Sequence, residues 1–278
     1  TKGFTALVVM ALVEAGTWSL GTTARSLLGG DLPLVDDAVT LEDLLAHRSG
    51  IGDYLDESDT ADINDHVMPV PVHQLSSTEA YLPLLDGHPQ VFTPGDRFAY
   101  NNGGFVLLAL LAERATGRPF DRLVADLVCA PAGLTQTGFV RSDALPRAVA
   151  TGYLDPDGWR TNALHLPVMG SGDGGLVTTV GDVRRFWLAV VAGRIVNPAT
   201  LARMAEPRSD VPAEGKRYGL GLWLHPTGPQ LALEGYDAGV SFRSWHHPLT
   251  GETLTVIGNT SNGAWPVVAA LEAEIVPA

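Results

Sequence analysis

A lysine near the start of an apolar segment is the first residue that could do chemistry. Lys2 follows Thr1 and precedes residues 4–14, FTALVVMALVE, which are apolar almost all round and end before Gly16. Such a segment is typical of a helix buried at the centre of a domain. Burial favours the neutral amine of a lysine, and a neutral amine can act as a general base. Taken alone, a lysine in this place is more often a solvated surface group.

The segment Tyr100-Asn101-Asn102 holds the second set of candidates, just before an apolar run that starts at Gly103. A tyrosine and an amide two positions apart in a loop can face one cleft. The phenol can then relay a proton, and the amide can bind a substrate carbonyl. The alternative is a capped loop that enters a helix.

The remaining polar candidates favour structural roles. We expect His47 to make a structural hydrogen bond, and the other seven histidines lack metal-ligand spacing. Cys129 lies in an apolar stretch typical of the core. Ser171, within Gly-Ser-Gly-Asp-Gly at 170–174, lacks the full G-x-S-x-G pattern and indicates a flexible loop at a cleft rim. The sequence therefore implies no metal and no cofactor.

Composition limits the classes of protein that fit. The chain has 278 residues, 45% of them hydrophobic, enough for one large core or two modest ones. Asp and Glu number 31 against 18 Lys and Arg, and the net charge of -13 disfavours nucleic acid and anionic lipid. No apolar run approaches the roughly 20 residues that a membrane span needs. We expect a small-molecule or peptide substrate as partner; the sequence does not indicate a compartment.

Helical patterns fill the first two thirds of the chain, and strand patterns fill the last third. Besides residues 4–14, helices are predicted at 41–46, 78–85, 103–116, 119–127 and 179–191. Short β-rich runs separated by turn residues predict an antiparallel meander, at 218–225, 230–236, 240–247 and 252–260. A closing helix at 266–275 would cover one face. The pattern predicts an α+β sandwich with a helical insert in its middle.

Six segments resemble, in the right order, those of the serine β-lactamase and penicillin-binding-protein-like family, which includes class C β-lactamase-like proteins, D-alanyl-D-alanine carboxypeptidases and related esterases. Residues 1–6, TKGFTA, resemble the end of the S-x-x-K motif and the helix after it, and Tyr100-Asn101-Asn102 resembles the Y-x-N element. Residues 44–51, LLAHRSGI, resemble the family's L-L-x-H-x-S-G-I segment. The others are residues 92–95, which resemble the loop before Y-x-N, and residues 134–139 and 174–182. The similarity covers nearly the whole chain.

This resemblance implies an α+β fold, in which an antiparallel β-sheet flanked by helices lies beside an all-helical lobe and the site lies between them. Lys2 would be the lysine of S-x-x-K, Tyr100 the tyrosine that relays a proton, and Asn102 the substrate-binding amide of Y-x-N. The implied activity is a serine hydrolase that forms an acyl-enzyme from an ester, an amide or a D-amino-acid-containing peptide.

We expect three parts along the chain. Residues 1–40 would hold a core helix and a connection of the α/β part, and residues 41–175 would form the mainly helical lobe and the cleft loops. Residues 176–278 would supply the C-terminal helices and the meander.

One motif departs from the family pattern. Relatives place K-T-G or H-x-G on a strand that lines the cleft, and this chain has Asp237-Ala238-Gly239. Gly239 keeps the glycine that permits close approach of a substrate. Asp237 replaces a basic or imidazole group with an acid, which repels a substrate carboxylate. We expect both to line the substrate site, and a neutral ester, an amide or a cation to be preferred to penicillins and D-alanyl peptides.

The nucleophile is expected outside this sequence. If Thr1-Lys2 closes the motif S-x-T-K, the serine belongs two positions before Thr1, and the first helix and strands of the fold would precede it too. A companion chain carrying that N-terminal segment, a modified serine, or loss of the segment would each explain this. Two alternative functions stay open: Thr1 as an N-terminal nucleophile with its α-amine as base, and a catalytically inactive binding homologue or truncated fragment.

Overall fold

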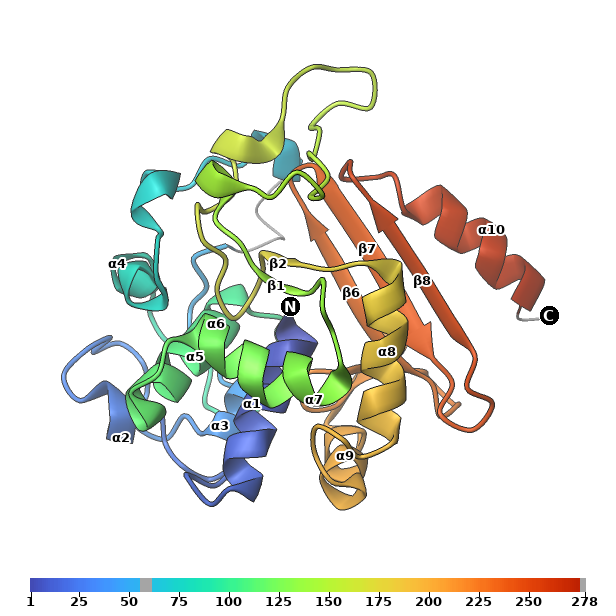
Figure 1. The fold of residues 1–278 in the computed structure, drawn as a ribbon. Coiled ribbons are helices and arrows are strands. Elements are labelled where there is room, and N and C mark those ends of the chain that lie inside the picture. The colour runs from blue at the N-terminus through green and yellow to red at the C-terminus, as the bar shows by residue number, and fades with distance from the viewer. Residues whose placement is uncertain (56–61, 276–278) are drawn as a thin grey trace.

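A six-stranded antiparallel sheet and a lobe of helices make up the described residues, 1–55 and 62–275, of the computed structural model (Figure 1). The sheet is a meander, because each strand pairs with the next one along the chain. Its strands are β3 (Ser209–Val211), β4 (Lys216–Tyr218), β5 (Trp223–Leu224), β6 (Leu231–Asp237), β7 (Val240–His246) and β8 (Thr253–Gly258). A separate small ribbon pairs β1 (Gly138–Phe139) with β2 (Leu176–Val177). The predicted α+β architecture is confirmed.

Most of the helices form a lobe on one side of the sheet, and one helix lies along its other side (Figure 1). They are α1 (Lys2–Glu14), α2 (Arg25–Leu28), α3 (Leu41–Leu45), α4 (Leu82–Leu85), α5 (Asn102–Thr116), α6 (Phe120–Val124), α7 (Ala130–Ala132), α8 (Val180–Val191), α9 (Pro198–Met204) and α10 (Trp265–Ile275). α8 packs against β8, and α10 follows β8 along the outer side of the sheet.

The first helix lies at the centre of the molecule, where the label N stands in Figure 1. Its all-round apolar character follows from this position, since α5 packs on one side and the sheet on another. The approach to the sheet is close: a Cβ on Gly3 would lie 2.4 Å from Leu233 Cδ2. Phe4 stacks on Phe186 of α8 at 4.4 Å between ring centroids. The central helix therefore joins the two layers in one hydrophobic core.

Two local predictions needed correction. The strand expected at 218–225 is a hairpin of β4 and β5, because the chain turns at Gly219 and Gly221. Gly221 has φ of +73°, and a Cβ on Gly219 would lie 2.1 Å from a backbone oxygen, so neither position accepts a strand side chain. β3 was not predicted. The helix expected at 119–127 continues to Ala132 through a π-helical turn (Ala125–Cys129), next to Pro131, which has no N–H for the ladder.

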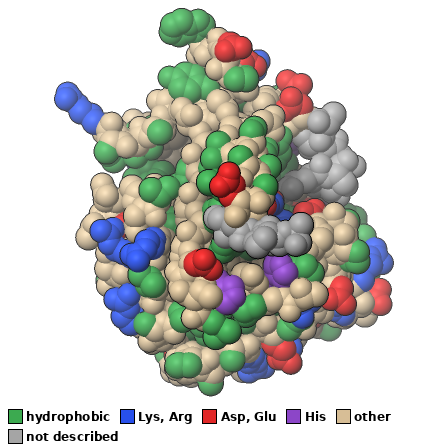
Figure 2. Space-filling model, turned by 90° about the vertical axis from the view of Figure 1, so that its right-hand side faces the viewer, with side chains coloured by type: hydrophobic (Ala, Val, Ile, Leu, Met, Phe, Trp, Pro, Cys, Tyr) green, Lys and Arg blue, Asp and Glu red, His purple; other side chains and the backbone are tan. Residues whose placement is uncertain are grey.

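The outer face carries apolar and charged side chains side by side. On α10 and β8, Val267, Leu271 and Ile257 are partly exposed. Figure 2, which views the molecule from the side of α10, shows hydrophobic groups interspersed with acidic and basic ones rather than a field of one sign. Among the described helices, none is long and apolar enough to cross a membrane.

Candidate active site

A cleft of about 1330 Å³ opens between the sheet and the helical lobe. Its lining includes all five residues that the sequence predicted for the site, which are Lys2, Tyr100, Asn102, Asp237 and Gly239. These residues come from α1, from the start of α5 and the loop before it, and from the turn between β6 and β7. Segments more than 200 positions apart in the chain therefore meet in one cavity.

Lys2 is fixed in the first turn of α1 by two hydrogen bonds. Its Nζ donates to Asn102 Oδ1 at 2.8 Å and to the backbone oxygen of Asp173 at 3.0 Å. The same Nζ lies 5.0 Å from the centroid of the Tyr100 ring. Thr1 caps the helix, and its hydroxyl accepts the backbone N–H of Leu176 at 3.2 Å. The lysine amine therefore points into the cleft beside the phenol and the amide.

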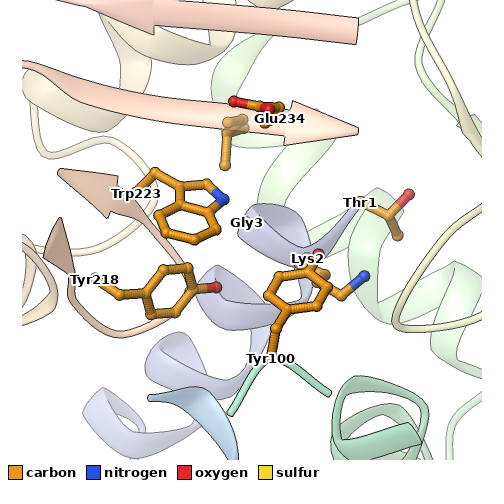
Figure 3. A pocket seen from close by; sticks show the side chains of 9 residues that line it. Thr1, Lys2, Gly3, Tyr100, Tyr218, Trp223 and Glu234 are labelled. Atoms are coloured by element: carbon orange, nitrogen blue, oxygen red, sulfur yellow. The ribbon is translucent and has the colours of Figure 1, made fainter. Parts of the chain in front are cut away.

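Figure 3 shows this arrangement from close by, with the Tyr100 ring next to Lys2 and with Tyr218 and Trp223 beyond it. A second, much smaller pocket is lined by these side chains and by Glu234 of β6. Tyr100 and Trp223 are nearly parallel, with ring centroids 6.2 Å apart. Burial raises the pKa of Tyr218 well above its ordinary value, and the nearby Tyr100 phenol adds to the effect.

Asn102 is held at both ends of its amide. Its Oδ1 accepts from Lys2, and its Nδ2 donates to the backbone oxygen of Leu55 at 3.1 Å. Asn101, the residue before it, caps α5: its side-chain oxygen accepts the N–H of Gly104 at 2.6 Å. In this geometry Asn102 orients the lysine amine, and its contact with a substrate stays a prediction.

Asp53 is a site residue that the sequence did not reveal. Its two carboxylate oxygens accept the backbone N–H groups of Asn102 at 2.6 Å and Gly103 at 2.8 Å, at the N-terminus of α5. Burial raises the pKa of Asp53 to about 6, although these N–H groups act in the opposite direction. The charge of Asp173 raises the pKa further. A single acid in a loop rich in acids carries no spacing signal, so no pattern could have selected it.

The glycine-rich loop at 170–175 also belongs to the site, and it is tightly packed rather than a flexible rim. Gly172 accepts from Thr5 Oγ1 at 2.6 Å, and a Cβ on Gly172 would lie 2.0 Å from the backbone oxygen of Phe105. The loop presents Asp173 to the cleft, where its backbone holds Lys2 and its carboxylate accepts the hydroxyl of Tyr54 at 2.5 Å. Ser171 is fully buried and does not line the cleft.

The turn at Asp237-Ala238-Gly239 reaches the cleft at the end of β6. Gly239 has φ of +70°, and its N–H donates to Ser261 Oγ at 2.8 Å. A Cβ at this position would lie 2.9 Å from Asn162 Cβ. The glycine is thus required by the backbone conformation and by contact with the 152–162 loop, a reason that the sequence did not suggest.

Acidic side chains outnumber basic ones along the cleft. Lys2 is the lysine of the lining, and the acids are Asp173, Glu214, Glu234 and Asp237. Glu234 is neutralised by Lys216 and Arg243, each at 2.7 Å. Within the described ranges, no group of three or more His, Cys, Asp or Glu side chains could hold a metal ion.

Comparison with known proteins agrees with this geometry. The profile of the Beta-lactamase family matches residues 1–271, and the chain therefore belongs to that family. A penicillin-binding protein from Bacillus halodurans is 36% identical and has a TM-score of 0.91, with 99% of this chain and 84% of that chain covered.

Two curated relatives are hydrolases by name. A D-aminopeptidase of Brucella anthropi is 28% identical over 76% of this chain, and the esterase EstB of Burkholderia gladioli is 29% identical over 80%. The chain spans 38% of the D-aminopeptidase and 63% of the esterase. Both the sequence motifs and the fold thus point to serine-hydrolase relatives.

The raised pKa of Asp53 predicts a pH-dependent stability. The folded carboxyl ionises near pH 6 and the unfolded one near 3.8, so the free energy of unfolding should fall as pH rises through this window. Chemical denaturation should show that, between pH 4 and pH 7, the free energy of unfolding of the natural protein falls by on the order of 2 kcal/mol relative to that of Asp53→Asn. Asp157→Asn, at an exposed position, is the control. A difference between Asp53→Asn and the natural protein that does not change with pH would contradict the assignment.

Proposed function

We propose that this protein is a serine hydrolase that forms an acyl-enzyme from an ester, an amide or a D-amino-acid-containing peptide. The observation that carries the proposal is the convergence of Lys2, Tyr100 and Asn102 in one cleft, with the lysine amine bonded to the asparagine and beside the phenol ring. The D-aminopeptidase and esterase names of its relatives support the same reaction class.

The proposed nucleophile is a serine two positions N-terminal to Thr1. On a helix, residues three positions apart lie on one face about 5–6 Å apart at Cβ. A serine one turn before Lys2, on a continuation of α1, would therefore stand next to the lysine amine. Thr1 and Lys2 both line the cleft, so a residue just before them would face a bound substrate.

Lys2, Asn102 and Tyr100 each have a role in the proposed reaction. The amine of Lys2 accepts the serine proton as the oxygen attacks the substrate carbonyl, and Asn102 keeps the amine in place. Tyr100 carries the proton to the leaving group. Backbone N–H groups stabilise the oxyanion, and water then cleaves the ester bond of the acyl-enzyme.

The acidic side chains of the cleft affect which substrates can bind. Burial raises the pKa of Tyr81, and the charges of Asp173 and Asp237 raise it further, which puts each carboxylate within electrostatic reach of Tyr81. A substrate carboxylate entering this region would be repelled. An uncharged ester or amide, or a substrate with an amine, would meet no such cost.

Mutation of the proton-transfer pair tests the proposal. In the full-length natural protein, Lys2→Ala and Tyr100→Phe should each lower kcat/KM for a p-nitrophenyl ester and a D-alanine p-nitroanilide by roughly 10²-fold to 10⁴-fold, the usual contribution of a general acid or base. Thermal unfolding should show that both variants fold. Tyr153→Phe, a tyrosine outside the cleft lining, is the matched control. Near-normal turnover in either site variant would overturn the assignment and would leave a binding homologue as the alternative.

Removal of the charge at Asp237 tests its role in specificity. Asp237→Asn should raise kcat/KM for a substrate with a free carboxylate roughly threefold to tenfold relative to its uncharged amide analogue, as about 1 kcal/mol of repulsion is removed. Steady-state kinetics with the two paired substrates give this ratio, with Asp157→Asn as the control. An unchanged ratio, or loss of activity toward both substrates, would contradict a role in substrate selection.

A further inference from the structure

His47 makes more contacts to the Tyr100 segment than a structural histidine in a loop requires. It is 1% exposed and has φ of +53°, a conformation that costs a residue other than glycine free energy. Among the described residues it shares a positive φ outside glycine only with Leu32. Strain of this kind persists where the surrounding structure demands it, and it gathers at functional sites.

Three consecutive residues are held by this one histidine. The backbone oxygen of His47 accepts the N–H of Ala99 at 2.9 Å, and Nδ1 accepts the N–H of Asn101 at 3.1 Å. Between these two bonds, the imidazole lies against the Tyr100 ring with centroids 4.3 Å apart. His47 thus fixes the backbone on both sides of Tyr100, with its backbone oxygen at Ala99 and its imidazole at Asn101, and the imidazole also supports the Tyr100 ring.

Further hydrogen bonds join residues 48–51 to the chain before and after Tyr100. Gly95 N donates to Arg48 O at 2.8 Å, and Val91 N donates to Gly50 O at 2.7 Å. Asn101 Nδ2 donates to Ile51 O at 2.9 Å. Residues 47–51 therefore form what we call the template: their hydrogen bonds hold in place the chain that carries Tyr100 and Asn102. No function has been given above to this part of the LLAHRSGI segment.

The ring of His47 is suited to this task only as a neutral imidazole. Because Nδ1 accepts a hydrogen bond, the proton of the neutral ring is on Nε2. Burial lowers the pKa of His47 well below its ordinary value, and the charge of Lys2 lowers it further. A proton on Nδ1 would face the N–H of Asn101, so the neutral form keeps the template intact.

We propose that His47 is a positioning residue, which sets the Tyr100 phenol against the amine of Lys2 by holding residues 99–101. The proposal rests on the proposed function, in which that phenol relays a proton. His47 itself does not line the cleft and touches no reacting atom.

The test compares kinetic effects in the full-length protein. His47→Leu should lower kcat by roughly 10-fold to 100-fold, as expected for a small misplacement of a reacting group, with KM changed less than about threefold. His47→Asn, whose amide oxygen can take the place of Nδ1, should recover most of the lost rate, whereas His47→Gln should not. The matched control is His246→Leu: His246 is equally buried and stacks on Trp187 away from the cleft, so this variant should lose thermal stability but keep kcat.

A double mutant separates positioning from general stabilisation. Added to Tyr100→Phe, His47→Leu should cause less than about a threefold further loss, because residues that act as a unit are not additive. Full additivity, or wild-type kcat in a folded His47→Leu, would overturn the positioning role. If His47→Leu does not fold, the comparison of His47→Asn with His47→Gln decides, and equal rates in these two variants would overturn it. Normal turnover in Tyr100→Phe alone would instead overturn the proposed function.

Discussion

The hydrogen bond between Lys2 Nζ and Asn102 Oδ1 joins the first turns of α1 and α5, two helices whose residues are mostly buried. α1 and α5 pack against each other along their apolar lengths, and this bond is where their N-terminal ends meet the cleft. A polar contact at the edge of a large core needs partners for every donor and acceptor. Much of the surrounding structure supplies those partners.

The groups that support the bond between Lys2 and Asn102 come from loops that are separate in the sequence. Asp53 satisfies the first N–H groups of α5, Leu55 takes the amide N–H of Asn102, and the 170–175 loop gives its Asp173 carbonyl to Lys2. Glycine at position 172 lets that loop approach α5 without a clash. The site is therefore built on helix ends and tightly packed loops, which position reacting groups more accurately than mobile segments do.

Some of this arrangement could be predicted from the sequence. The central helix, the meander and the closing helix have strong periodicity, and Lys2, Tyr100 and Asn102 stand in segments with recognisable motifs. The hydrophobic pattern indicates one strand where the structure has the hairpin of β4 and β5, because the close packing of Gly219 and Gly221 does not change that pattern. Asp53, Tyr54 and Asp173 could not be predicted, since their importance comes from tertiary contacts between loops 47–55, 99–103 and 170–175.

The acid at Asp237 adds a carboxylate to a cleft that Asp173 and Glu214 already line. The large cavity, its acids and the template at 47–51 are together consistent with one acyl-transfer chemistry and a substrate choice set by charge. A sequence motif predicts the reacting groups, and hence the chemistry. It does not predict the substrate, because specificity depends on the loops around the reacting groups.

We propose that a serine two positions before Thr1 attacks substrate with the help of Lys2. The most direct measurement is treatment of the full-length natural protein with a fluorophosphonate probe, followed by intact mass spectrometry and mapping of the labelled peptide. Our account predicts one label per chain, on that serine, with labelling strongly slowed in Lys2→Ala. A folded protein that takes no label, or that is labelled at another residue such as Ser171, would contradict it.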